Sequence, residues 1–190
     1  MSAVKKIKFG LDTFGDIQYD DNNQPLSAAQ TIRNVVEEGV LADQVGLDHF
    51  NVGEHHRDDF AISAPDIVLA GIATRTKNIT LGTGVTVLSS DDPIRVYERF
   101  ATIDALSNGR AEITAGRGSF IESFPLFGYD LNDYGVLFEE KLQILVKALK
   151  ERPITWSGTT RTPLINQDVF PKTEKGAIPL RIGVGGTPES

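Results

Sequence analysis

The chain alternates strand-like and helix-like segments from one end to the other, and this alternation constrains its fold more than any other feature. Segments rich in Ile, Val, Leu, Phe and Thr predict strands, and segments with apolar residues at helical spacing separate them. The predicted strands are 7–13, 48–53, 79–88, 111–115 and 178–184. Strands connected through helices in this way run parallel by right-handed crossovers. The order predicts either a (β/α)₈ barrel or a doubly wound open sheet.

Four helices are predicted between these strands, and each has a residue that can begin or end it. Ser27 can cap the first helix, and Gly46 suits its end. Ser63 precedes Asp66 by three residues, a capping-box spacing that predicts the start of the second helix. The other two helices are marked by Asp92-Pro93 and Asn108-Gly109 at the two ends of the third and by Arg152-Pro153 after the fourth.

The composition is that of an ordinary globular protein, and we expect residues 1–190 to form a single domain. A formal net charge of -7 argues against nucleic acid or an anionic membrane as a partner, because both attract a basic face. The lack of cysteine excludes disulfides, Cys-zinc sites and thiolate nucleophiles. The N-terminal residues contain no apolar stretch long enough for a signal peptide, so we expect a cytoplasmic protein.

The last residues of the sequence contain a strand, a glycine turn and the first residues of a helix. A closed barrel of eight units needs roughly 250 residues. About five of the eight units are therefore present, and we expect the chain to be the N-terminal part of a longer barrel.

Unusual residues follow the carboxyl ends of the predicted strands, where both architectures place their sites. They are Glu54-His55-His56, Thr83-Gly84, Gly116-Arg117-Gly118 and Gly185-Gly186. The turn after the first strand, 11–15, lacks the Gly-x-Gly-x-x-Gly pattern of dinucleotide-binding folds, which disfavours that architecture.

The adjacent residues His55 and His56 are the candidates for proton chemistry, because histidine titrates near neutral pH and Glu54 could fix a tautomer. A hydrogen-bonded network that only anchors the loop is an equally good interpretation. A metal site completed by Asp58 or Asp59 is weaker, because adjacent histidines lack the usual ligand spacing.

Two glycine-flanked segments are candidates for binding an anion. Arg117 lies between two glycines and could offer a planar fork to a phosphate. The turn 185–190 precedes a predicted helix start, where backbone N–H groups can face an anion. Plain turns are the alternative for both. The glycines of Thr83-Gly84-Val85 indicate either a bulge or a close approach to a flat ligand.

Taken together, these motifs resemble those of a known family. They are Glu54-His55-His56, Leu81-Gly82-Thr83-Gly84-Val85, Asp92-Pro93-Ile94-Arg95, Ser107-Asn108-Gly109-Arg110, Gly116-Arg117-Gly118 and Val184-Gly185-Gly186-Thr187-Pro188-Glu189-Ser190. In this order they resemble the N-terminal portion of the bacterial luciferase-like flavin-dependent monooxygenases.

The resemblance implies a (β/α)₈ TIM barrel that binds FMN, with a non-prolyl cis peptide around Gly84-Val85. His55 would be the catalytic residue, with Glu54 and His56 supporting it. The residues that the resemblance implies for cofactor binding are Thr83, Gly84, Val85, Gly116, Arg117, Gly185, Gly186, Thr187 and Ser190. Of these, Arg117 and the turn 185–190 would hold the phosphate.

The resemblance also implies partners. FMN would be reduced by NAD(P)H directly or through a flavin reductase, and the reduced flavin would use O₂ to oxidise a small organic substrate. A homodimer is expected, because the family often dimerises through helices of this half. Three alternatives stay open: a deazaflavin coenzyme in place of FMN, flavin binding without turnover and, less favoured, a metal-dependent barrel hydrolase.

Overall fold

Parallel strands form the centre of the protein. The computed structural model describes residues 7–118 and 120–185. The first sheet has the order β1-β2-β3, and the second has the order β4-β5-β8. Their parallel strands are β1 (Gly10–Thr13), β2 (His49–Val52), β3 (Thr80–Thr83), β4 (Thr86–Val87), β5 (Ile113–Gly116) and β8 (Leu180–Ile182).

The two sheets are joined between β3 and the start of β5. A parallel bridge pairs Leu81 with Ala111. Leu81 donates its N–H to the Arg110 carbonyl at 2.9 Å, and Glu112 donates to the Leu81 carbonyl at 2.9 Å. Spatial order therefore follows chain order without reversal, which is the arrangement of a barrel and not of a doubly wound sheet. Within the described ranges these strands form an open arc from β1 to β8 and do not close into a barrel.

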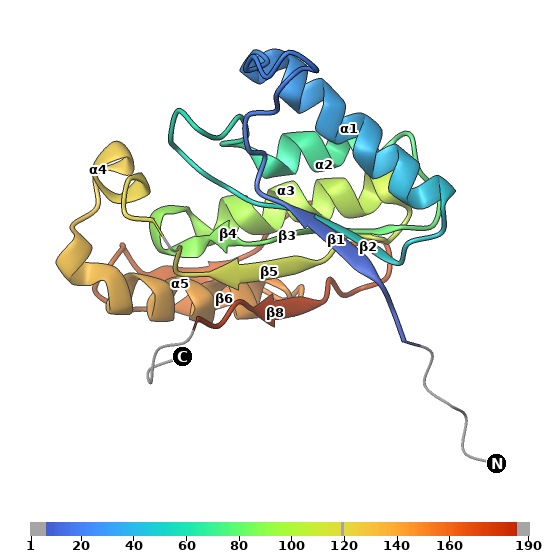
Figure 1. Cartoon of the computed structure of the whole chain (residues 1–190). Helices are drawn as coiled ribbons and strands as arrows, with labels where there is room; N and C mark the ends of the chain where they lie inside the picture. Colours follow the sequence, from blue (N-terminus) through green and yellow to red (C-terminus); the bar gives the residue numbers. More distant parts are fainter. Residues whose placement is uncertain (1–6, 119, 186–190) are drawn as a thin grey trace.

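Helices cover one side of this arc. They are α1 (Ala28–Gln44), α2 (Pro65–Ala73), α3 (Pro93–Ser107) and α5 (Tyr134–Ala148). Figure 1 shows α1, α2 and α3 along one side of the strands, and each packs on the next, with α5 packing on α3. None of the helices in the described part of the chain is both long and apolar enough to cross a bilayer.

The predicted ends of the first and third helices are confirmed. Ser27 accepts a hydrogen bond from the Gln30 N–H, and Gly46 has the positive φ of 84° that ends α1. Asp92 accepts hydrogen bonds from the first N–H groups of α3, and Asn108 closes that helix with a left-handed φ of 56°.

The predicted cap of the second helix is wrong. The residue at the N-cap position is Ala64, and no side chain caps the helix. Pro65 fixes the backbone of the first turn and has no N–H that needs an acceptor, so a cap contributes less there. The carboxylate of Asp66 instead forms an ion pair with Arg99 of α3 at 3.2 Å.

All five predicted strands have other bounds in the structure; β5 begins at Ile113 and not at 111, and β8 is Leu180–Ile182 and not 178–184. The first strand begins at Gly10 and not at residue 7, because the Phe9 N–H is bound by the side chain of Asp48 at 2.9 Å. The predicted strand 79–88 is divided into β3 and β4 by a cis peptide between Gly84 and Val85, and it ends in a short 3₁₀ helix, η1 (Leu88–Ser90).

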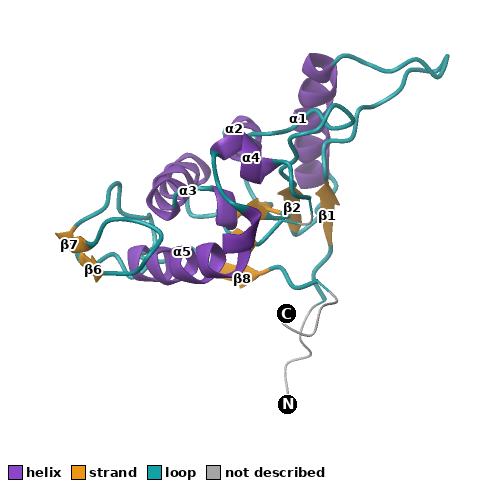
Figure 2. Cartoon of the chain, turned by 90° about the vertical axis from the view of Figure 1, so that its left-hand side faces the viewer, coloured by secondary structure: helices purple, strands orange, loops and turns teal. Residues whose placement is uncertain are grey.

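The sequence analysis missed three other elements. An antiparallel hairpin of β6 (Ile154–Trp156) and β7 (Leu164–Gln167) follows α5. Figure 2 shows this hairpin beside the end of α5 and far from α1. The long loop after β5 contains α4 (Ser123–Phe127) and a 3₁₀ turn, η2 (Leu131–Asp133).

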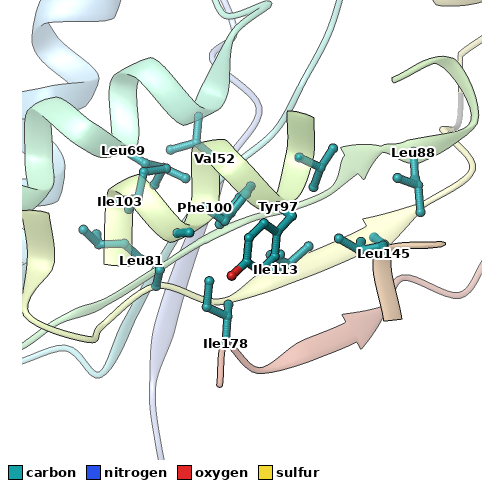
Figure 3. Packing of buried hydrophobic residues seen from close by; sticks show 14 of the residues in the cluster. Val52, Leu69, Leu81, Leu88, Tyr97, Phe100, Ile103, Ile113, Leu145 and Ile178 are labelled. Carbon is teal, nitrogen blue, oxygen red and sulfur yellow. The ribbon is translucent and has the colours of Figure 1, made fainter. Parts of the chain in front are cut away.

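Strand and helix side chains meet in one hydrophobic core. Phe50, Leu81 and Ile113 project from the strands toward Phe100 and Leu145 of the helices, and all five are at most 2% exposed. Figure 3 shows this packing around Tyr97 and Phe100 of α3. The opposite face of the strands carries polar side chains, so the strands alternate with period two.

Arg110, in the turn that follows α3, forms hydrogen bonds to several elements of this arc. Asn108 and Gly109 both have positive φ, and they turn the chain so that the guanidinium lies under the helix ends. It donates to the carbonyl oxygens of Ser107, Ala73, Thr76 and Ile79 at 2.6–3.0 Å and to the Thr76 hydroxyl at 3.0 Å. One side chain therefore satisfies the ends of α2 and α3 and the start of β3.

We expect Arg110→Ala to lower the free energy of unfolding by about 3 kcal/mol, because it leaves several half-buried carbonyl groups without a donor. Arg110→Lys should retain only part of this stability, since the three donors of an ammonium share one nitrogen and cannot span all the carbonyl groups that the guanidinium reaches from three. Urea unfolding followed by circular dichroism measures both. Arg33→Ala is the control, because Arg33 is exposed and donates only to Gln30. Equal midpoints for Arg110→Ala and Arg33→Ala would contradict this role.

Candidate active site

A hollow lies at the carboxyl ends of the strands, where the sequence places its unusual residues. The residues that line it are Phe14, Glu54, His55, His56, Gly84, Val85, Val87, Gly118, Phe120, Glu122 and Ser123. They come from the segments that follow β1, β2, β3 and β5. The loops meet because parallel strands end at the same edge.

The floor of the hollow is formed by Gly84 and Val85, which the cis peptide joins as expected. A Cβ atom at Gly116 would lie 2.5 Å from Val85 Cγ2, and one at Gly183 would lie 2.7 Å from Val85 Cγ1. Only glycine at these two positions leaves room for the Val85 side chain.

Glu54 connects the loop that carries His55 and His56 to this floor. One carboxylate oxygen is 3.0 Å from His56 Nε2, and the other accepts the Val87 N–H at 3.2 Å. The side chains of Glu54 and His56 are 10% and 9% exposed. A second cavity, lined in part by Thr83, Asp66 and Arg99, also reaches Glu54 and His56. The pair therefore separates the two cavities.

The His55 ring is held by aromatic rings. It stacks on Phe60 with centroids 4.1 Å apart, and it meets the edges of Phe14 at 5.5 Å and Phe120 at 5.0 Å. Burial among these rings lowers the pKa of His55, although the negative charge of Glu122 opposes the shift. The ring is therefore neutral at neutral pH, with one nitrogen able to accept a proton.

The two adjacent histidines share one hollow because the strand has ended before them. His55 donates its backbone N–H to the Ile62 carbonyl at 3.0 Å, and Ala61 donates to the Gly15 carbonyl at 2.7 Å. These bonds fold the loop 54–62 against the turn after β1. A Cβ atom at Gly15 would meet Ile62 at 2.6 Å, so this close packing also depends on glycine.

The predicted cofactor residues divide into three groups. Gly84 and Val85 line the hollow, and Gly116 packs beneath Val85. Thr83 lies at the second cavity instead, where its hydroxyl is 2.8 Å from that of Thr86. Arg117 and Gly185 lie beyond the ends of the paired strands β5 and β8. The other three predicted positions, Gly186, Thr187 and Ser190, lie outside the described residues.

Arg117 lies in the segment that directly follows β5. Its guanidinium is 5.3 Å from the centre of the Phe138 ring of α5. Because Gly183 donates to the Ala115 carbonyl at 2.8 Å, the chain beyond β8 runs next to the chain beyond β5. Arg117 and Gly185 are thus at neighbouring strand ends.

Two features of the site escaped the sequence analysis. One is the wall of aromatic rings formed by Phe14, Phe60 and Phe120, none of which was singled out as a candidate site residue. The positions of Phe14 and Phe120 could have identified them as candidates, because each follows the end of a strand. Glu122 was missed as well, and one of its carboxylate oxygens is buried without a hydrogen-bond partner in the described structure.

The third histidine belongs to a different cluster. His49 Nδ1 is 3.5 Å from the carboxylate of Glu112, which is 2% exposed and also pairs with Arg181 of β8. This cluster lies on the polar face of the strands. In the described part of the chain, no three His, Asp or Glu side chains are grouped to hold a metal ion.

Comparison with known proteins gives one family. Residues 8–190 match the family described as luciferase-like monooxygenase. The uncharacterized protein y4vJ of Sinorhizobium fredii is 35% identical over 133 residues, which are 70% of this chain and 38% of that protein. The oxygenase component of the flavin-dependent trigonelline monooxygenase of Acinetobacter baylyi is 30% identical, over 82% of this chain and 43% of that protein. This chain spans less than half the length of these relatives.

Solved structures show the same fold. The monooxygenase RslO1 from Streptomyces bottropensis superimposes with a TM-score of 0.82 at 23% identity, over 97% of this chain and 55% of that one. The oxygenating constituent of 3,6-diketocamphane monooxygenase from Pseudomonas putida, in complex with FMN, gives 0.78 at 21% identity over 92% and 50%. The coenzyme F420 dependent tetrahydromethanopterin reductase from Methanopyrus kandleri gives 0.68 at 21% over 95% and 51%.

We expect Glu54→Ala to lower the free energy of unfolding by about 2 kcal/mol, because the Val87 N–H and the His56 ring would lose their buried partner. Glu54→Gln should lose less, since an amide oxygen can still accept one of the two hydrogen bonds. Urea denaturation compares them with Asp58→Ala, a change at an exposed carboxylate of the same loop. A Glu54→Ala protein as stable as Asp58→Ala would show that Glu54 does not hold the loop to the floor.

Proposed function

The chain belongs to the luciferase-like monooxygenase family, and from this premise we propose that the whole protein is a flavin-dependent oxygenase. It would use FMN, O₂ and an external source of electrons to oxidise a small organic substrate. The observation that carries the proposal is the hollow itself, in which the His55 ring, packed among phenyl rings, lines the same space as Gly84 and Val85.

The residues present fit FMN. A flat ring system needs a floor without projecting side chains, and the contacts of Gly116 and Gly183 with Val85 keep that floor low. Phe14 and Phe120 provide apolar walls. The phosphate needs a cation and free backbone donors, and we assign these to Arg117 and the glycine turn that begins at Gly185.

Bound FMN would carry the two electrons and activate O₂, which side chains alone cannot do. The protein's own residues have narrower tasks. His55, neutral because burial lowers its pKa, can take a proton and return it. Glu54 and His56 fix the loop that carries it. The phenyl rings around His55 exclude water from the hollow.

The source of electrons follows from the relatives. The trigonelline enzyme is named as an oxygenase component, which supports a separate flavin reductase as the partner of this protein. Direct reduction by NAD(P)H is the alternative route. The F420-dependent neighbour supports a second candidate, a deazaflavin coenzyme in the same hollow.

We expect the purified chain to bind FMN saturably, with quenching of FMN fluorescence as the ring enters a phenyl-walled site. Gly116→Ala should weaken binding about tenfold or more, because its Cβ would displace Val85, which forms the floor, toward the hollow. Gly135→Ala is the matched control, since a Cβ there meets nothing within 4 Å. Uptake of F420 without FMN would favour the deazaflavin candidate, and uptake of neither would overturn the proposal.

We expect His55→Ala to reduce product formation about 100-fold or more, because proton transfer is lost. FMN affinity should stay nearly unchanged, because the floor at Gly84 and Val85 is kept. Single-turnover assays with reduced FMN and a panel of aldehydes, alkanes and sulfur compounds measure the effect. His49→Gln, at a histidine outside the hollow, is the control and should keep the parent rate. Loss of FMN binding with unchanged product per bound flavin would assign His55 to binding instead.

A further inference from the structure

The rings that confine His55 leave its nitrogen atoms without a fixed partner. Phe14, Phe60 and Phe120 contact its faces and edges, but a phenyl ring cannot select a tautomer. Within the described part of the chain, no side-chain hydrogen bond to the His55 ring is present. A proton-transferring imidazole needs such a bond, because the nitrogen that is bound determines which one faces the ligand.

Most carboxylates near His55 are already engaged or solvated. Glu54 holds His56 and the Val87 N–H, and Asp59 forms a two-pronged pair with Arg57 at 2.9 Å. Asp16, in the turn after β1, is exposed to water. None of these three has an oxygen that is both buried and unpartnered.

Glu122 differs from all of them. It lines the same hollow as His55, and its Oε1 atom is buried without a hydrogen-bond partner. It also follows Phe120 by two residues, and the Phe120 ring contacts the His55 ring. A buried carboxylate oxygen that has given up water without gaining a donor is costly, so a donor is expected to approach it.

We propose that Glu122 is the positioning residue for His55, and that its carboxylate accepts a ring N–H of the imidazole in the working enzyme. This inference rests on the proposed function for its catalytic meaning. The contact would leave the second ring nitrogen of His55 facing the ligand. Glu54 and His56 would hold the loop, and Glu122 would hold the proton-transferring ring.

The charges around His55 allow a test by titration. Glu122 follows β5, Asp16 follows β1, and Glu54 and Asp59 lie on the loop of His55 itself; all four raise its pKa, while burial lowers it more. The cation of Arg57 lies 4.8 Å from the Phe120 ring centre. Among the carboxylates the largest effect is that of Glu122, so removal of its charge should lower the pKa of His55 further.

The experiment measures the His55 ring directly by ¹H–¹⁵N correlation spectra of the histidine side chains, on the full chain across pH. His49→Gln and His56→Gln spectra identify the signals. We expect Glu122→Gln to lower the His55 pKa and to change its tautomer ratio, and Glu122→Asp to restore part of both. Asp16→Asn is the matched control, since it removes one exposed charge, and it should change the tautomer ratio little.

In turnover assays the acid limb of the pH profile should move in the same direction as the measured pKa, with a smaller change in KM than in kcat. An unchanged His55 pKa and tautomer ratio in folded Glu122→Gln would overturn the positioning role, whatever the flavin result. If the ring signals change as expected but no flavin binds, the contact stands and the proposed function fails.

Discussion

A pair of backbone hydrogen bonds at Leu81 holds together the two parts on which the site depends. They link β3 to the start of β5, so that two three-stranded parallel sheets become one arc. Every strand of that arc ends at the same rim, and the segments that follow β1, β2, β3 and β5 line the hollow. Without this link, the loop of His55 after β2 and the loop of Glu122 after β5 would belong to separate sheets. The Arg110 side chain strengthens the same junction by its hydrogen bonds to the Ile79 and Ala73 carbonyl oxygens.

Much of the arc could be predicted from the sequence, because its signals are local. Caps at Ser27 and Asp92, the left-handed stop after α3 and the glycines of the third strand each depend on a few neighbouring residues. The cap at Ser63 could not be decided locally, since Pro65 begins the helix and Asp66 pairs with an arginine of another helix. The hairpin β6-β7 was missed because strands of three and four residues are too short to show a clear periodicity in the sequence.

The sequence indicated several residues that meet in the hollow, but not the different surroundings of His55 and His56. His55 and His56 are equivalent in the sequence, yet one is buried among phenyl rings and the other is bound to Glu54. That difference depends on how the loop 54–62 packs against the turn after β1, and no pattern of neighbouring residues in the sequence indicates this packing. The unpartnered oxygen of Glu122 has the same origin, because its surroundings come from loops more than 60 residues apart in sequence.

The floor and the walls of the hollow come from different kinds of structure, and this difference has an evolutionary consequence. Its floor is formed by Gly84 and by Val85, whose side chain lies between Gly116 and Gly183, so a side chain added at either of these glycines would clash. Its walls are phenyl side chains on loops, and loops accept substitution far more readily than strands. Relatives that share the floor can therefore differ in the walls, and under the proposed function such changes would alter the substrate while leaving the cofactor site as it is.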